Sequence, residues 1–173
     1  MRDPTWLLIP AVVISSAAYG ATYLTVEQAQ AAIFPGAQLT ASPVALTKEQ
    51  VGAIEKKSGV NVRNSEVKLW KSSDGGVFIV DEVVGKHEFF TIAVGLNHDG
   101  SVKQIEIMDY KESYGYEVRN EAWRKQFTGK TSAAPLKLTD DIKNISGATL
   151  SCRHVTDAVK RLLATYDIAI KSA

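Results

Sequence analysis

Four runs rich in β-branched and aromatic residues follow one another through the middle of the chain, with only a few residues between them. Gaps this short allow antiparallel hairpins, because a parallel crossover needs a dozen or more residues. The gaps contain Gly, Asp, Ser and Asn, which β-turns favour. The sequence therefore predicts an antiparallel meander with strands at Glu66–Lys71, Val77–Val84, Phe89–Leu96 and Val102–Tyr110.

The third predicted strand is apolar on both faces. Phe90 and Val94 share one face, and Ala93 lies on the other. A strand of this kind is central and covered on both sides, so helices must pack on the sheet. Helical spacing of apolar residues predicts the covering helices at Glu117–Phe127 and from about Leu150 onward. The order of elements predicts an α+β fold, in which an antiparallel sheet of about four or more strands carries packed helices.

Two short helices are predicted before the sheet, and both begin with the same signal. Thr25-Val-Glu-Gln28 and Thr47-Lys-Glu-Gln50 each place Thr at the N-cap and Gln three residues later, which is the capping-box arrangement. The turn-rich stretch Gly36–Pro43 is predicted to connect them. Residues 21–62 are therefore predicted to form a helical N-terminal region, followed by the main domain at residues 63–173.

The N-terminus carries an apolar run, Trp6–Ala18, that follows Arg2 and ends among small residues. This pattern is typical of an export signal, with Ala18-Tyr19-Gly20 as the cleavage site. A retained anchor is the alternative, since extension to Leu24 approaches the roughly 20 residues of a membrane span. Residues 1–20 are predicted to be a signal peptide or membrane anchor. The protein is expected to be exported, either periplasmic or anchored to the outer face of the cytoplasmic membrane.

Charge and cysteine content exclude several classes of protein. The chain has 20 basic and 19 acidic side chains without a long run of one sign, so no nucleic-acid partner is expected. The single cysteine, Cys152, cannot form an internal disulfide, a c-type haem attachment or a cysteine-based metal site. The three histidines lack the spacing of metal ligands, and no metal site is predicted. Any redox chemistry would need another cofactor.

A short motif, Ser146-Gly-Ala-Thr149, stands just before the closing helix. Gly147 has no Cβ and Ala148 adds little bulk, so the Thr149 hydroxyl is predicted to be accessible. Unpaired N–H groups and the helix dipole would stabilise a phosphate at this helix N-terminus. Taken alone, the four residues are also typical of a Ser/Thr-rich helix cap, so the rest of the chain has to decide.

Four stretches in the same order resemble the FMN-binding domain family, which includes the covalently flavinylated subunits of sodium-pumping NADH:quinone oxidoreductase and of Rnf-type electron-transport complexes. Ile92–Val102 resembles its strand, Asp-Gly turn and strand, and Tyr110–Tyr116 resembles its Glu-Thr-Pro-Gly loop. Ala122–Lys130 resembles the following helix, and Ser146–Thr149 resembles the flavin-attachment motif. The resemblance covers about Val77–Leu163, and an ordered set of matches is much rarer than one.

The resemblance implies that a magnesium-dependent flavin transferase joins FMN, through its phosphate, to the Thr149 hydroxyl, and that the flavin then carries electrons. With one domain and its own predicted export signal, the chain resembles the stand-alone exported members of the family more than a subunit embedded in a pump. The implied partners are the transferase and redox donor or acceptor proteins, including a membrane electron-transport complex. The predicted cofactor contacts come from the motif, the loop and the following helix: Ser146, Gly147, Ala148, Thr149, Leu150, Glu112, Ser113, Tyr114, Tyr116 and Trp123.

Two places differ from the family pattern. Lys143 stands where the attachment motif usually has Asp, and Asp140 and Asp141 lie slightly upstream, as a short insertion would place them. In the loop, Ser113 and Tyr114 replace the usual Thr and Pro, which keeps a hydroxyl but loses the fixed φ of proline.

The leading interpretation is an exported electron-transfer flavoprotein with FMN on Thr149. An electron carrier is favoured over a self-contained enzyme, because no acid–base or nucleophile constellation is visible. One alternative is a flavin-dependent reductase that acts on its own small substrate. The other is a binding or structural module that keeps the fold without flavin.

Overall fold

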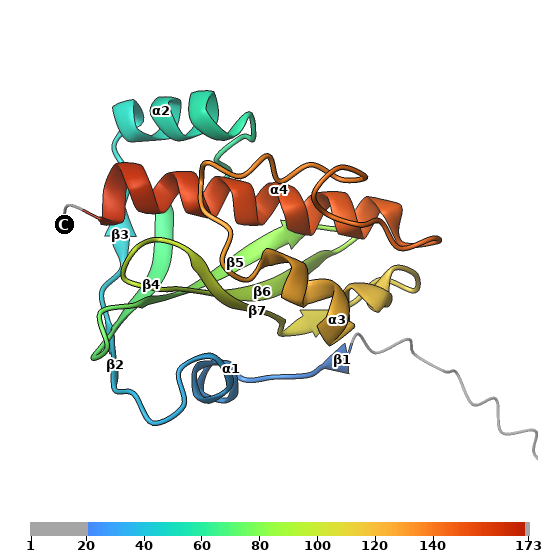
Figure 1. The fold of residues 1–173 in the computed structure, drawn as a ribbon, viewed down its shortest axis with the longest axis horizontal. Coiled ribbons are helices and arrows are strands. Elements are labelled where there is room, and N and C mark those ends of the chain that lie inside the picture. The colour runs from blue at the N-terminus through green and yellow to red at the C-terminus, as the bar shows by residue number, and fades with distance from the viewer. Residues whose placement is uncertain (1–20, 172–173) are drawn as a thin grey trace, which may run out of the picture.

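An antiparallel sheet forms the centre of the structure (Figure 1). This computed structural model describes residues 21–171, so the predicted signal peptide or anchor at residues 1–20 lies outside the described range. The four predicted strands are present, and their lengths differ from the prediction by a few residues only. They are β4 (Glu66–Ser72), β5 (Val77–Val84), β6 (Phe89–Leu96) and β7 (Val102–Ile107), and β8 (Asp109–Tyr110) follows directly. The predicted α+β fold is confirmed.

The N-terminal region adds strands to this sheet. The order is β2-β4-β5-β6-β7, with β2 (Leu39–Ala41) and β3 (Val44–Ala45) both antiparallel to β4. The prediction that residues 36–43 form only a turn-rich connector is therefore wrong. A strand of three residues gives no readable alternation, and its conformation is fixed by pairing with β4 rather than by local preference. A separate two-stranded ladder joins β1 (Ala21–Thr22) to β8.

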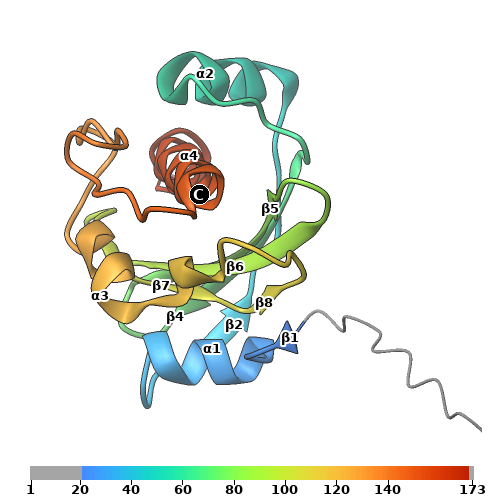
Figure 2. The ribbon, with the colours of Figure 1, turned by 90° about the vertical axis from the view of Figure 1, so that its right-hand side faces the viewer.

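Both faces of β6 are covered, as its apolar sequence predicted. Figure 2 shows α4 on one face of the sheet and α1 on the other, with α2 outside α4. The helices are α1 (Val26–Ile33), α2 (Lys48–Ser58), α3 (Glu121–Arg124) and α4 (Thr149–Thr165), which continues as a π-helical segment, Tyr166–Ile170. Helix α4 packs on Ile92 and Val94 within the larger core, whereas α1 packs on Phe78 and Ala93 in a smaller one.

The predicted helix at Glu117–Phe127 is divided into three short pieces: η1 (Tyr116–Arg119), α3 and η2 (Lys125–Phe127). These pieces pack beside the edge strand β7, and α1 rather than this segment covers the second face of the sheet. Asn120 interrupts the helix, because its backbone is non-helical and its side chain caps α3 by accepting from the N–H of Ala122. The spacing of apolar residues predicted the helix but not its interruption at Asn120.

Both predicted capping boxes are present. The Thr25 hydroxyl accepts from the N–H of Gln28 at 3.2 Å, and the Gln28 side chain accepts from the N–H of Thr25 at 2.8 Å. The same reciprocal pair joins Thr47 and Gln50 at the start of α2. Gly59 then ends α2 in the left-handed conformation with φ of 70°. Between residues 21 and 171, no helix is both long and apolar enough to cross a membrane.

The close approach of α1 to the sheet gives a stability prediction. A Cβ at Gly95 would lie 2.2 Å from Cγ2 of Ile33, so Gly95→Ala is expected to destabilise the fold by about 1–3 kcal/mol through overpacking. Gly52→Ala is the matched control, since a Cβ there meets nothing within 4 Å and lies inside helix α2. The control should be neutral or stabilising by up to about 1 kcal/mol. Urea unfolding measures both, and equal stability of the two variants would contradict this packing.

Candidate functional site

The start of α4 lies beside a shallow cleft of about 220 Å³. Three segments distant in sequence form it: the turn between β5 and β6, the loop after β8, and the residues around the start of α4. Five residues predicted to contact the cofactor are among those that line it. The lining residues are Lys86, Tyr110, Glu112, Tyr114, Gly115, Gly147, Ala148, Leu150 and Ser151.

Thr149 is the first residue of α4 and is exposed at the edge of this cleft, between the lining residues Ala148 and Leu150. The prediction that it lies at a helix N-terminus is confirmed. Ala148 occupies the N-cap position without a side-chain hydrogen bond, so no side chain competes for the N–H groups of the first turn. Gly147 has a φ of +85°, and a Cβ there would meet nothing within 4 Å. The approach to the Thr149 hydroxyl is therefore open from the Gly147 side.

Asn144 holds the Thr149 hydroxyl in position. Its side-chain amide donates to Oγ1 of Thr149 at 2.8 Å. A hydroxyl oxygen has two lone pairs and one hydrogen, so after this bond Thr149 retains one lone pair and its own proton. That is the arrangement a hydroxyl needs in order to lose a proton and form a new bond through oxygen. Asn144 was not among the predicted site residues. Its only sequence signal is a hydrogen-bonding side chain five residues before Thr149.

The hydroxyl of Tyr110 ties the loop after β8 to the first turn of α4. It donates to the carbonyl of Tyr114 at 2.7 Å and lies 2.7 Å from the hydroxyl of Ser151, which must then be the donor to it. Burial raises the pKa of Tyr110, so the hydroxyl keeps its proton at neutral pH. Gly115 permits this contact, because a Cβ there would lie 2.2 Å from Oγ of Ser151. No sequence pattern indicated the Tyr110–Ser151 pair.

Glu112 joins the same loop to the turn between β5 and β6. Its Oε1 accepts from the N–H of His87 at 2.5 Å and from the N–H of Glu88 at 3.0 Å. Burial opposes its ionisation, but these backbone hydrogen bonds, with one from Lys86, outweigh burial and lower the pKa of Glu112. A Cβ at Gly85 would lie 2.3 Å from this carboxylate. Glu112 therefore lines the cleft and also holds one of its walls.

The other predicted contacts fall into two groups. Tyr114 and Tyr116 are 83% and 53% exposed and are free to cover a ring system at the cleft, whereas only Tyr114 lines it directly. Ser113 and Ser146 are also exposed but do not line the cleft. Trp123 lies in the core, with its ring 5.3 Å from that of Phe127. Trp123 does not line the cleft, and its link to this site is the hydrogen bond to the loop before the motif.

Hydrogen bonds to Trp123 and Gln126 hold the loop before the motif. The indole N–H of Trp123 donates to the carbonyl of Lys143 at 2.7 Å, and the N–H of Lys143 donates to the Gln126 side chain at 2.8 Å. The side chain of Lys143 is exposed. Asp141 does not take the place of the usual acid, because its carboxylate accepts from the N–H of Lys137 at 2.7 Å and pairs with Lys130 at 2.9 Å.

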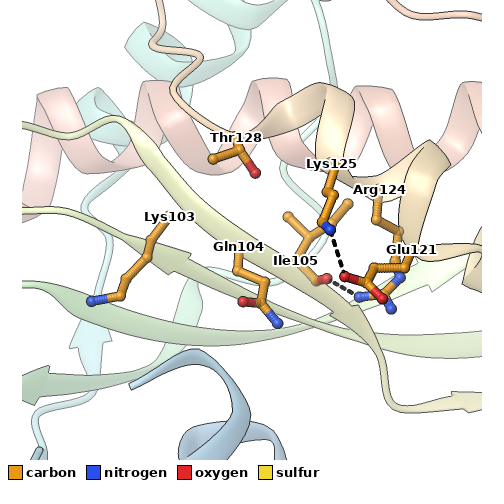
Figure 3. A pocket seen from close by; sticks show the side chains of 7 residues that line it. All are labelled: Lys103, Gln104, Ile105, Glu121, Arg124, Lys125 and Thr128. Carbon is orange, nitrogen blue, oxygen red and sulfur yellow. Dashed lines mark hydrogen bonds and ion pairs between the residues drawn. The ribbon is translucent and has the colours of Figure 1, made fainter. Parts of the chain in front are cut away.

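A larger hollow of about 410 Å³ lies elsewhere, between β7 and the segment α3–η2 (Figure 3). It shares no residue with the cleft beside Thr149. Its charged groups all take part in ion pairs: Lys125 pairs with Glu121 at 2.7 Å inside the hollow, while Arg124 pairs with Glu106 at 2.6 Å and Lys103 with Asp74 at 3.3 Å outside it. Size alone therefore does not identify the functional site, because the cations of this hollow are already paired and it lies away from the predicted attachment motif.

Residues 85–164 match the model of the FMN-binding domain family. This part of the chain belongs to that family, and its cofactor is FMN. The matched range begins in the turn that forms one wall of the cleft and ends inside α4, so it contains all the cofactor contacts predicted from the sequence. No curated protein matches the chain.

The residues at the cleft suit FMN. The uncapped N-terminus of α4 suits its phosphate, and the open space at Gly147 leaves room for a bulky substituent on Thr149. Tyr114 and Leu150 offer an aromatic and an aliphatic surface for the ring system, while Lys86 adds a cation. When bound, FMN supplies the one- and two-electron redox chemistry that the side chains lack.

Two other kinds of reactive site, a nucleophilic thiol and a metal centre, have less support. Cys152 is fully buried, and burial raises the pKa of its thiol, so it is protonated and inert at neutral pH. Across residues 21–171, no group of three or more His, Cys, Asp or Glu side chains is arranged to hold a metal ion.

The Tyr110 hydroxyl gives a prediction with a matched control. Tyr110→Phe and Tyr166→Phe each remove one hydroxyl, and Tyr166 donates to the carbonyl of His98 away from the cleft. Each change should cost about 1 kcal/mol of stability. Only Tyr110→Phe should also speed amide hydrogen exchange in residues 111–116, because it frees that loop from α4. Equal exchange in the two variants would contradict the proposed tie.

Glu112 gives a prediction about pH. Its folded pKa is lowered from 4.5, so its stabilising effect is present above that value and is lost as the pH falls through the folded pKa. Glu112→Gln should therefore be less stable than the wild type at neutral pH, and the difference should vanish well below 4.5. Urea unfolding at both pH values measures this. A difference that persists in acid would mean that shape, not charge, accounts for the effect.

Proposed function

We propose that the protein is an exported electron-transfer flavoprotein in which FMN is linked through its phosphate to Oγ1 of Thr149. The observation that carries this proposal is the exposed Thr149 hydroxyl at the uncapped N-terminus of α4, held by Asn144 beside an open cleft. A structural helix cap would accept a hydrogen bond from its own first turn, whereas no side chain caps α4.

The size of the cleft favours a covalent link. Pockets that bury most of a drug-sized ligand have volumes of roughly 300–1,000 Å³, and this one has about 220 Å³. A shallow site of this kind binds a free ligand weakly. A tether at Thr149 keeps the flavin at a high effective concentration without a deep pocket. The same shallowness leaves part of the ring exposed, as electron exchange with another molecule requires.

Attachment needs an enzyme and an activated donor. The transfer joins Oγ1 of Thr149 to the flavin-side phosphorus of a flavin dinucleotide and breaks the phosphoanhydride bond. The nucleoside monophosphate leaves, and the hydroxyl proton passes to a base. Within residues 21–171 no side-chain carboxylate or imidazole hydrogen-bonds this hydroxyl, which supports a separate flavin transferase as the source of that base.

The cleft favours an electron carrier over a self-contained enzyme. Its hydroxyls belong to Tyr110 and Ser151, which bond to one another, and the Glu112 carboxylate is occupied by backbone N–H groups. No free acid–base pair therefore remains for a bound substrate. We infer that the partners are the transferase and redox proteins that exchange electrons with the flavin. The apolar run in residues 1–20 supports export.

The attachment prediction uses two substitutions of Thr149 and one control elsewhere in the chain. Thr149→Ala should abolish covalent flavin, because the nucleophilic oxygen is removed, while Thr149→Ser should keep a measurable part of it. Thr128→Ala is the control, since Thr128 is an exposed threonine outside both the motif and the cleft. The measurement is flavin fluorescence of the protein band after denaturing electrophoresis, from an exporting host that also makes a flavin transferase. A fluorescent Thr149→Ala band would contradict the assignment.

Lys143 is the residue that favours the flavin-free alternative. A comparison of the wild type with Lys143→Asp tests this alternative. Its side chain is exposed beside the motif, so a positive charge stands where the family pattern has a negative one. If a transferase reads that charge, Lys143→Asp should raise the fraction of protein that becomes fluorescent. A colourless wild type together with a fluorescent Lys143→Asp variant would favour a natural module without flavin.

A further inference from the structure

A second hollow lies next to the flavin cleft, between α4 and the end of β5. It has a volume of about 230 Å³. Its walls come from α4 with His154, from β5 with Val84, and from the segment after α2 with Arg63. Figure 1 shows β5 running beneath α4 and ending near the start of that helix. We call this the α4–β5 hollow.

The hollow and the flavin cleft are successive parts of one groove. Leu150 lines the cleft and His154 lines the hollow, and residues four apart lie on the same face of a helix. On the facing wall, Lys86 lines the cleft and Val84 lines the hollow. A helix rise of about 1.5 Å per residue places His154 about 7.5 Å along the axis from Thr149. A long group attached to Thr149 can therefore extend over Leu150 into the hollow.

His154 makes no hydrogen bond to any other residue in the range 21–171. Its Nδ1 is buried without a partner, whereas its Nε2 remains accessible at the hollow. Among backbone groups, buried N–H groups without an acceptor are rarer than acceptors with an unfilled lone pair. The same preference puts the proton of the neutral imidazole on Nε2. His154 therefore offers an N–H donor to the hollow, and the described part of the chain supplies no acceptor for it.

The charged side chains that line the hollow are balanced. Arg63 and Arg161 stand against Glu82 and Asp157, and Arg161 also pairs with Asp81 at 2.6 Å outside the hollow. A balanced set of this kind does not favour a phosphate, which the uncapped start of α4 suits better. The hollow instead suits an uncharged group that both donates and accepts hydrogen bonds.

The ring system of FMN has such a group at one end. Its pyrimidine edge alternates carbonyl oxygens with an N–H, and its other end is an apolar dimethylbenzene ring. His154 and Arg63 can donate to the carbonyl oxygens, and the Asp157 carboxylate can accept from the N–H. Val84 and Ala158 add apolar surface for the ring itself. The apolar end of the ring would then remain over the flavin cleft.

We propose that the flavin ring lies along this groove with its pyrimidine edge in the α4–β5 hollow, where Nε2 of His154 donates a hydrogen bond to it. The proposal rests on the attachment to Thr149 proposed above and adds a contact residue outside the motif. Uptake of two electrons and one proton from a redox partner leaves one negative charge on the flavin, at this edge. A donor there stabilises that charge, so His154 raises the midpoint potential of the flavin.

The first test follows the histidine side chains by nitrogen-15 NMR. The exported protein is compared as wild type with flavin and as Thr149→Ala without it, and His154→Gln assigns the signal. Nε2 of His154 should shift when the flavin is attached. His98 is the internal control, since it lies in the turn between β6 and β7 and does not line the groove. A His154 signal that is the same with and without flavin would overturn the proposal.

The second test measures the midpoint potential of the attached flavin. His154→Ala should make the potential more negative, because the donor is lost. His154→Gln should restore much of the difference, since its side-chain amide supplies an N–H. His98→Ala is the matched control and should leave the potential unchanged. Equal potentials in the wild type and His154→Ala would overturn the proposal, as would a His154→Gln variant that behaves like His154→Ala.

The intact mass separates a failure of this proposal from a failure of the proposed function. A wild type with the mass of the unmodified chain would contradict attachment at Thr149 but would not decide the role of the hollow. In that protein, free FMN added in excess should still shift the His154 signal. An unchanged signal would overturn the proposal, and so would an equal shift with AMP, which has a phosphate but no flavin ring.

Discussion

The geometry of the site depends on the hydrogen bonds of the Tyr110 hydroxyl. It sits at the end of β8, reaches the carbonyl of Tyr114 in the loop and accepts from Ser151 in the first turn of α4. One buried oxygen therefore joins the sheet, the loop and the helix that carries Thr149. Glu112 extends the same arrangement to the β5–β6 turn through backbone N–H groups. The cleft is the surface where these fastened segments meet, and its shape follows from them.

The site is well braced but shallow, and this combination explains the proposed chemistry. A cleft of about 220 Å³ is smaller than the roughly 300–1,000 Å³ of pockets that bury most of a drug-sized ligand. The proposed covalent bond at the exposed Thr149 hydroxyl would hold the flavin at this cleft and leave its ring accessible to a partner. The proposed attachment and the proposed exposure of the flavin both rest on this geometry.

The strands and the site motif could be predicted because their signals are local. Hairpin turns fix β5 and β6 to the residue, and the capping boxes fix the starts of α1 and α2. The covering of the second face by α1, the pairing of β2 with β4 and the Tyr110–Ser151 contact were not predictable, since each depends on residues far apart in the chain. The motif predicted Thr149 as the attachment residue, but only the fold revealed that Asn144 donates to its hydroxyl and that Asp141 is already paired.

The central claim is that Thr149 carries FMN as a phosphoester, and the most direct measurement is the intact mass of the protein isolated after export, followed by the mass of its proteolytic fragments. The account predicts a mass equal to the chain plus one FMN less one water, with the entire increase on the fragment that contains Thr149. An exported, folded protein whose mass is that of the unmodified chain, or an increase carried by any other fragment, would contradict it.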